Sequence, residues 1–487
     1  MVEYYGKITE MRGVRTMEKV LRKMILIAVI LGAIQLMSAC GSSEKELTTE
    51  DFLEDFDYMM QTMEESYPYF GVAERKLGVD IRALAEETRD LIGNYPDSME
   101  EVAAEVGIAL EDLPALDGQI FWSILRHEFF SHLTGFAHTY PLDSGFYSAL
   151  QPYYANPGSY LYTSHNEHPF TNSVSKSFYE EQEALFTSLS DEEGPLFQFV
   201  FRGFTPVELT GDAAGTEIIE EGRIAYLEVP SLMGFHSGAV ANLRRFYREI
   251  QDYEHLIIDI RDNPGGSPDT WRMMIMNPLW PGRDHMPDMP LYGFYRGSSL
   301  GKALGEENTH MEGQHTRNIP ETGELRNARE IIEENQLTGI NEEDLQTLEY
   351  GVRFNTSISN IEEGTMQQLG MQNPTPFEGE IWLLTNERNF SGSALFALHA
   401  KEMGFATLVG EKTGGAYTTS SSGAFFALPN TGVIVRWDID YLTDDEGRVL
   451  NEFPTTPHYY NREGMDALET VLELIEESRQ ASRSDNE

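Results

Sequence analysis

Cysteine and positive charge are both scarce in this chain of 487 residues. Its one cysteine, Cys40, has no second thiol with which to form an intrachain disulfide or a cysteine-based metal cluster. The 35 lysines and arginines stand against 80 aspartates and glutamates, which gives a formal net charge of −45. Such a surface repels nucleic-acid phosphates, so no nucleic-acid partner is expected. The sequence also lacks EF-hand, Walker-lysine and GxGxxG spacings, and it predicts neither a metal nor an organic cofactor.

An extended apolar run is found near the N-terminus. The run Met24–Ile34 follows basic residues and is too short to span a bilayer comfortably, which is typical of a secretory signal. We therefore predict a signal peptide over residues 1–39, with Met17 as the true start. The sequence LMSACG then resembles a bacterial lipoprotein cleavage box, so Cys40 is the predicted lipid-attachment site and residues 40–50 the lipidated tether. This predicts a protein anchored to the outer face of a bacterial cytoplasmic membrane; an uncleaved anchor or an ordinary secretory signal are alternatives that also imply export.

The rest of the chain divides into regions of different periodicity. Phe52, Phe56, Met59, Met60 and Met63 recur at three- and four-residue steps, as on the buried face of a helix. Farther along, apolar strands alternate with helices, which predicts an α/β core. The predicted regions are a helical N-terminal domain at 51–140, a connecting region at 141–216, the core at 217–475 with an insertion at 283–376, and a flexible tail at 476–487.

The segment Ile381–Gly415 contains the clearest candidate for a catalytic residue. An apolar strand (Ile381–Thr385) leads into a polar turn, and a helix (Ser393–Met403) follows the turn. Ser391 lies just before this helix, where a hydroxyl is exposed and close to free backbone N–H groups. An acyl-transfer nucleophile needs such a position, although a plain serine N-cap also occurs there.

Paired glycines follow a second apolar strand, His255–Ile260. The segment Arg261–Gly266 reads RDNPGG. Two glycines in succession let the backbone turn tightly and present N–H groups to a ligand. A plain turn is one alternative, and a phosphate-binding loop is another, although no Walker lysine supports it.

In this order, the two segments resemble the tail-specific (C-terminal-processing) serine peptidase family. The matching motifs are DIRDNPGG at 259–266, NFSGSALFA at 389–397 and GFATLVGEKTGG at 404–415, and further resemblance covers 222–235 and 447–457. The resemblance implies an α/β fold with a crotonase-like core of repeated strand–strand–helix units and an N-terminal helical domain. It implies a serine-type peptidase that hydrolyses polypeptides. It also makes residues 141–216 a candidate for a degenerate peptide-binding module.

The family has two catalytic designs, and the sequence distinguishes them. A Ser–Lys dyad needs a lysine 25 positions after the serine, where this chain has Ala416; Lys412 lies nearby, in a variable turn. The second design resembles the C-terminal half of tricorn protease and uses serine, histidine and glutamate. His138 in GFAHT and Glu452 in LNEFP match its histidine and glutamate. The resemblance therefore implies a catalytic triad of Ser391, His138 and Glu452.

Each member of this triad has a chemical role in the reaction that the resemblance implies. His138 would take the proton of Ser391 and pass it to the leaving amine, while Glu452 fixes the imidazole tautomer, directly or through a further hydroxyl. The tetrahedral oxyanion needs preorganised N–H donors. By analogy with the family, the predicted donors are the backbone N–H groups of Gly392, Gly265 and Gly266.

Several alternatives stay open at this stage. Ser393 is a rival nucleophile two residues after Ser391, whereas His127, His132 and His399 match no motif. The residue before the family's histidine is commonly glycine or serine, and here it is Ala137. The same fold also admits a catalytically silent protein that binds peptides or small apolar ligands, or another hydrolase such as an esterase. The residues indicate no oligomeric state.

Overall fold

The computed structural model describes residues 47–100, 103, 109–159, 162–202, 214–233, 237–280, 289–315, 324–356, 375–419 and 423–484. The predicted signal peptide, its start at Met17 and the lipid-attachment site Cys40 lie outside these residues. The chain divides into two compact units. The first comprises Met1–Thr134, Thr139–Val207 and Gly423–Trp437, and the second comprises Gly135–His138, Glu208–Ser422 and Asp438–Glu487. Among the helices described, none is both long enough and apolar enough to cross a membrane.

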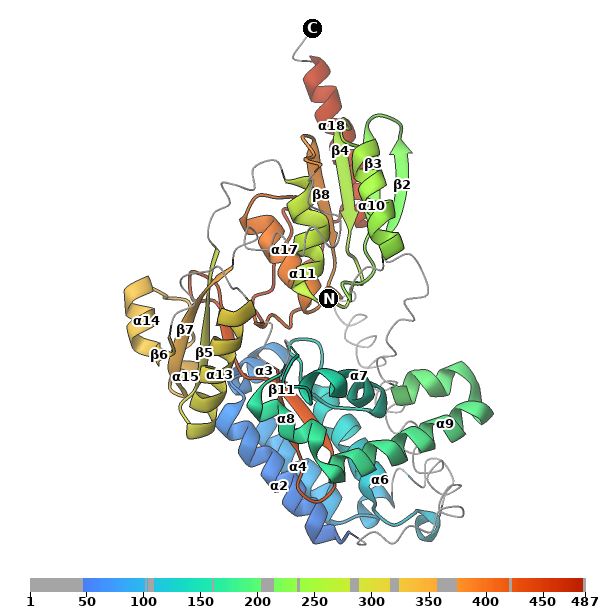
Figure 1. Cartoon of the computed structure of the whole chain (residues 1–487), viewed down its shortest axis with the longest axis vertical. Coiled ribbons are helices and arrows are strands. Elements are labelled where there is room, and N and C mark those ends of the chain that lie inside the picture. The colour runs from blue at the N-terminus through green and yellow to red at the C-terminus, as the bar shows by residue number, and fades with distance from the viewer. Residues whose placement is uncertain are drawn as a thin grey trace, which may run out of the picture. The chain divides into compact units, whose positions relative to one another are not determined.

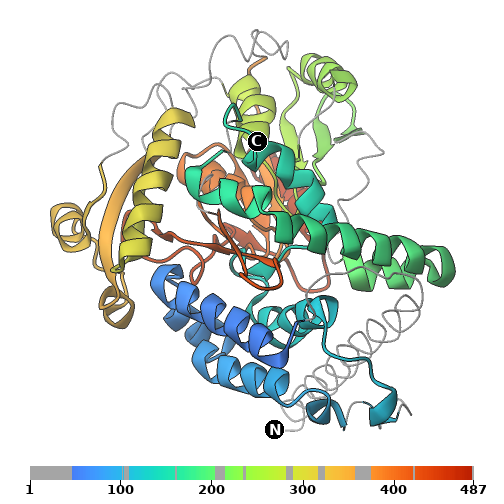
Figure 2. The ribbon, with the colours of Figure 1, turned by 60° about the horizontal axis from the view of Figure 1, so that its bottom comes forward.

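The first unit begins with the predicted amphipathic helix, α2 (Thr49–Ser66). Thr48 and Asp51 form a capping box that satisfies N–H groups at its start. Four of the five residues of the predicted stripe are buried, and Met60 is half-buried. α2 lies beside α4 (Ile81–Gly93), as Figure 2 shows in blue and light blue. The unit also contains helices α3 (Phe70–Leu77) and α6 (Gly118–Ile124).

The described part of the connecting region is mainly helical, with strand residues only at its two ends. It forms α7 (Ser144–Tyr154), α8 (Ser164–Thr171) and α9 (Ser173–Arg202). A small sheet in the first unit has the order β1-β11-β10, with β1 at Tyr140–Pro141, β11 at Ile434–Asp438 and β10 at Gly423–Ala427. β11 ends at Asp438, which belongs to the second unit.

The second unit is built around a six-stranded sheet of order β13-β9-β8-β4-β3-β2. Neighbouring strands are parallel except for the antiparallel pair β2–β3. Helix α10 (Ser237–Glu249) lies between β3 and β4 in the chain, and α17 (Gly392–Glu402) lies between β8 and β9. The strands are β2 (Gly215–Glu220), β3 (Ile224–Glu228), β4 (His255–Asp259), β8 (Glu380–Thr385), β9 (Thr407–Gly410) and β13 (Tyr459–Tyr460).

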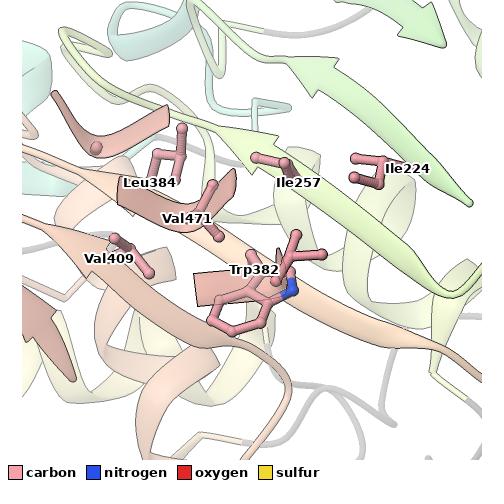
Figure 3. Close-up of a cluster of buried hydrophobic side chains, with 8 residues drawn as sticks. Ile224, Ile257, Trp382, Leu384, Val409 and Val471 are labelled. Atoms are coloured by element: carbon pink, nitrogen blue, oxygen red, sulfur yellow. The ribbon is translucent and has the colours of Figure 1, made fainter. Parts of the chain in front are cut away.

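Helices cover both faces of this sheet. On one face, α18 (Ala467–Ser484) inserts Val471 among apolar side chains of the strands, including Ile257 and Leu384 (Figure 3). Strand residues between these point to the opposite face, where α17 and α11 (Pro268–Trp271) lie together (Figure 1). There the rings of Trp271 and Phe396 stack with centroids 5.4 Å apart. Two covered faces explain the continuous apolar runs of the strands, and the predicted α/β class is confirmed.

The C-terminal helix is longer than the sequence predicted. α18 continues to Ser484, well into the region 476–487 that was predicted as a flexible tail. Val471 and Ile475 anchor its first turns in the core, and an exposed Arg479–Glu476 pair follows on its surface. The predicted tail is thus helical through Ser484, because the buried turns hold a helix that polar residues then extend.

The insertion at 283–376 contains a second sheet, which the sequence analysis missed. Its order is β12-β5-β7-β6, and the long strands β5 and β7 pair antiparallel. Helix α13 (Ser299–His315) lies along this sheet (yellow in Figure 2). The strand β12 comes from beyond the insertion, so part of the sheet is built by a segment far along the chain. The remaining elements are β5 (Met289–Arg296), β6 (Arg326–Asn327), β7 (Leu348–Thr356), β12 (Tyr441–Thr443), α12 (Asn277–Leu279), α14 (Ala328–Asn335) and α15 (Glu342–Leu345).

Candidate active site

Ser391 lies between the end of β8 and the start of α17, in a backbone conformation that is rare for a residue with a side chain. Its φ is 55° and its ψ is −123°. A non-glycine residue in such a region is strained, and strain of this kind is concentrated at functional sites. The Ser391 side chain makes no capping hydrogen bond to the helix that it precedes, and it is half-buried. The alternative of a plain N-cap serine therefore does not describe this residue.

Ser393, the rival nucleophile, has a structural role. It is completely buried, and its Oγ donates to the Asn263 carbonyl over 2.7 Å. The same oxygen accepts the Phe390 N–H over 3.0 Å. A hydroxyl held in this way joins the strand-to-helix turn to the glycine loop and is not available to attack a substrate.

The glycine loop after β4 packs directly against the Ser391 turn. Gly265 has a φ of 98°, and a Cβ added to it would lie 2.4 Å from the Phe390 carbonyl oxygen, 2.8 Å from Gly392 N and 2.9 Å from Ser391 Cβ. Backbone and nucleophile approach so closely that any residue with a Cβ would displace the turn that holds Ser391. The sequence analysis brought these two segments together by resemblance, and the structure places them in contact.

The three predicted oxyanion donors differ in their availability. The Gly265 N–H donates to Asn263 Oδ1 over 2.8 Å, so this group is already used within the loop. Gly392 is the first residue of α17, and its N–H has no acceptor within the helix. Gly266 follows with a φ of 129°, and its backbone N lies 3.2 Å from the place that a Gly392 Cβ would take. The backbone N–H groups of Gly392 and Gly266 therefore fit the role better than that of Gly265.

His138 belongs to the same unit as Ser391, and it is paired with a carboxylate. Its Nδ1 lies 2.9 Å from Asp438 Oδ2, and the same oxygen accepts the backbone N–H of His138 over 2.9 Å. Asp438 is completely buried, and the His138 side chain is 11% exposed. The imidazole also meets the ring of Phe390, the residue before Ser391, edge to face with centroids 5.1 Å apart. The structure thus brings the predicted base next to the turn that carries the predicted nucleophile.

A short backbone segment joins the two catalytic candidates. The Gly415 carbonyl accepts the Ser391 N–H over 3.0 Å, and the Ala416 N–H donates to the Phe136 carbonyl over 2.8 Å. Ala416 has a φ of 57°, a second strained residue in the same place. The histidine segment and the nucleophile turn are therefore bonded to adjacent residues of one strand-like segment.

The remaining predicted site residues lie close in sequence to this network. Glu452 is half-buried, and its N–H donates to the Val449 carbonyl over 3.1 Å. Among the residues that the structure describes, no hydrogen bond joins Glu452 to His138, so its catalytic role stays a prediction. Its neighbour Asn451 is buried and binds the backbone of Tyr417 through both side-chain atoms.

Two other candidate bases are excluded by their surroundings. Lys412 is 54% exposed, and its amine forms a surface ion pair with a Glu387 carboxylate oxygen 3.6 Å away. Burial lowers the pKa of His399 to about 3, and the charge of Arg272 acts in the same direction. His399 Nδ1 is bonded to the Leu395 carbonyl over 2.8 Å within α17. No group of three or more metal-ligating side chains is found in the described stretches.

Asp438 is the site residue that the sequence analysis missed. It lies in VIVRWDIDYL, an apolar strand that carries two carboxylates. A charged side chain in such a run is buried only when it has a partner. The carboxylates in this strand could therefore have been predicted to pair with another polar group. The partner was invisible in the sequence because 300 positions separate Asp438 from His138.

Part of the chain is similar to known peptidases. The model of peptidase family S41 matches residues 223–286 and 296–460. Similar solved structures include a peptidase candidate from Parabacteroides merdae ATCC 43184 (14% identity, 88% of this chain and 97% of that chain, TM-score 0.44). They also include mature CPAF complexed with lactacystin (13%, 85% and 94%, TM-score 0.43) and the photosystem II D1 C-terminal processing protease (13%, 53% and 50%, TM-score 0.30). No curated protein matches the chain significantly. Over these matched residues, which carry Ser391 and both loop glycines, the chain is similar to peptidase family S41.

Proposed function

We propose that the protein is a serine endopeptidase that hydrolyses peptide bonds of polypeptides through an acyl-enzyme, with Ser391 as the nucleophile and His138 as the general base. The observation that carries this proposal is the backbone of Ser391. A serine with φ of 55° at the N-terminus of α17, with no capping bond, has the geometry of a nucleophile at a strand-to-helix turn. The strain is maintained because the Gly415 carbonyl and the glycine loop hold both sides of the turn.

The surroundings of Ser391 supply the other requirements of acyl transfer. The His138 ring lies against that of Phe390, the residue before Ser391, which places the imidazole beside the nucleophile turn. Catalytic hydrogen bonds commonly tighten only when substrate binds. The N–H groups of Gly392 and Gly266 provide donors for the oxyanion. Losing one such donor typically costs on the order of 10²–10³-fold in rate.

We also propose that the peptidase is exported and attached to the membrane by a lipid on Cys40. The support is the sequence alone: a basic start, a short apolar run and a cysteine in LMSACG. The strongly acidic body would then be held near the membrane by its lipid, not by its surface. Growth of a bacterial host with a palmitate analogue tests this, since the wild-type chain should become labelled and Cys40→Ser should not.

Cleavage of a denatured polypeptide tests the peptidase proposal. The full-length chain is incubated with carboxymethylated casein, beside the Ser391→Ala and His138→Ala variants, and fragments are identified by mass spectrometry. We expect internal fragments from the wild type and a loss on the order of 10⁴-fold or more in both variants. Alanine keeps the Cβ of serine, so Ser391→Ala retains the same backbone requirement, and circular dichroism checks its folding. Cleavage that persists in Ser391→Ala, or a folded wild type that cleaves nothing, would contradict the proposal.

A further inference from the structure

We propose that Asp438 is the positioning residue that orients His138, in the place for which the sequence suggested Glu452. The inference rests on the proposed function, because a base needs orienting only if Ser391 and His138 react with substrate. It concerns one carboxylate and one imidazole, and both are held in the second unit.

The hydrogen bonds of Asp438 fix both the position and the tautomer of the imidazole. One oxygen, Oδ2, accepts the backbone N–H of His138 and meets its ring at Nδ1, each over 2.9 Å. A carboxylate has no proton to give, so Nδ1 must carry the proton between them. Nε2 then has a free lone pair, which is the form that can accept a proton from a serine hydroxyl.

Asp438 is also held in the same framework as the nucleophile. Two residues farther on, Asp440 accepts the N–H of Thr419 over 3.0 Å and the hydroxyl of Thr418 over 3.1 Å. Thr418 and Thr419 continue the segment whose Gly415 carbonyl holds the Ser391 N–H. The carboxylate that orients the base and the turn that carries the nucleophile are therefore fixed to one continuous piece of backbone.

The family resemblance implies that Glu452 contacts the imidazole either directly or through a hydroxyl. The structure supports neither contact. A direct contact at Nδ1 is not available to Glu452, because Asp438 already forms the hydrogen bond with His138 Nδ1. An indirect contact would need a hydroxyl next to the histidine. Ala137, before His138, is buried and has no polar side-chain atom, and the hydroxyl of Thr139, after it, donates to the Tyr67 hydroxyl over 3.4 Å. The residue in the LNEFP segment that reaches the network is Asn451, through the backbone of Tyr417.

The proposed step balances without any further reactant. The Ser391 hydroxyl proton moves to His138 Nε2 as a bond forms between Oγ and the substrate carbonyl carbon, and the carbonyl electron pair becomes the oxyanion. Collapse breaks the C–N bond, and the Nε2 proton passes to the leaving amine. Asp438 stays ionised throughout and stabilises the imidazolium that forms between these events.

Phosphonylation kinetics of the full-length chain test this inference. A fluorophosphonate is used at several concentrations, so that the maximal inactivation rate and the concentration for half-maximal rate are obtained separately. In Asp438→Asn the amide group would face Nδ1 and favour the wrong tautomer. We expect the maximal rate to fall by about 10⁴-fold, as for the equivalent change in serine proteases, with little change in half-maximal concentration. Glu452→Gln should lose far less.

Asp344→Asn is the matched control for removing a buried carboxylate. Asp344 is also buried and accepts a hydroxyl, that of Tyr441, over 2.8 Å, but it lies in helix α15, which contacts strand β7 of the second sheet. Its phosphonylation rate should stay at the wild-type value. Asp438→Glu, which keeps a carboxylate, should recover part of the rate lost in Asp438→Asn, and this distinguishes orientation of the base from general support of the fold.

A spectroscopic readout keeps the inference separate from the proposed function. In wild type with ¹⁵N-labelled histidine, His138→Ala identifies the ring signals, and these should report a proton on Nδ1; in Asp438→Asn the proton should move to Nε2. A wild type that is not phosphonylated would refute the proposed function but leave this tautomer test intact. A phosphonylated wild type whose rate is unchanged in folded Asp438→Asn, or falls more in Glu452→Gln, would overturn the assignment of Asp438.

Discussion

Replacing Gly265 by alanine should damage catalysis far more than it damages the fold. The added methyl group would lie 2.4 Å from the Phe390 carbonyl oxygen and 2.8 Å from Gly392 N, and both atoms are backbone. Neither can move without moving the turn that holds Ser391. The change therefore acts on the nucleophile and on an oxyanion donor together, although it touches no reacting group itself.

The chain offers a matched control at Gly404, the residue just past α17. Gly404 has a φ of 72°, but a Cβ added there would meet nothing within 4 Å. Alanine at either position costs about 1–2 kcal/mol of unfolding free energy, because the residue must adopt a positive φ. Only Gly265→Ala adds an overlap, which in packed interiors costs about 1–3 kcal/mol more. We expect Gly265→Ala to lose about 2–5 kcal/mol of unfolding free energy, against about 1–2 kcal/mol for Gly404→Ala.

The rate of phosphonylation distinguishes the two variants more sharply. A misplacement of about 1 Å in a reacting group can cost about 10²-fold, so Gly265→Ala should react at least about 10²-fold more slowly than wild type. Gly404→Ala should react at the wild-type rate, and urea unfolding followed by circular dichroism gives both stabilities. If Gly265→Ala reacts at the wild-type rate and is no less stable than Gly404→Ala, the close approach of the glycine loop to Ser391 is wrong.

Three further predictions test individual residues. Ser393→Ala should lower the unfolding free energy by about 1–3 kcal/mol, because two buried backbone groups lose a hydrogen-bond partner. The variant should still be phosphonylated at Ser391. Loss of labelling in the folded variant would contradict a purely structural role of Ser393. Lys412→Ala should change the phosphonylation rate by less than about twofold, as expected for an exposed ion pair. A large loss would indicate that Lys412 is the base. His399 has a folded pKa of about 3, so as the pH falls below 6.5 the unfolded chain takes up its proton first and stability is lost. Between pH 7 and pH 4 this should cost wild type about 3 kcal/mol more than His399→Leu, measured by urea unfolding; equal losses would contradict a buried neutral imidazole.

The sequence predicted the elements of this fold wherever local pattern determines structure. The helical stripe from Phe52, the apolar strand His255–Ile260 and the strand–turn–helix around Ser391 all appear as expected. The second sheet was missed because β5 depends on pairing with β7 on one side and with β12 on the other, and β12 lies about 150 residues away in the chain. Strand pairing over such distances leaves no local period to read.

The candidate site was predictable as far as motifs extend. Ser391 and the paired glycines lie in motifs, and the structure places them in contact. The partner of His138 was not predictable, because Asp438 belongs to no motif and the pairing exists only in three dimensions. Likewise, the choice between Ser391 and Ser393 depended on which hydroxyl is hydrogen-bonded to the backbone, and the spacing of residues in the sequence does not indicate this.

Mapping the fluorophosphonate adduct on the wild-type chain tests the central claim most directly. Trypsin cleaves after Arg388 and Lys401, which gives a peptide, Asn389–Lys401, that contains both candidate serines. Fragmentation of this peptide by mass spectrometry assigns the modified residue. The account predicts an adduct on Ser391 and none on Ser393. An adduct on Ser393 or elsewhere in the chain, or a folded protein that forms no adduct, would contradict it.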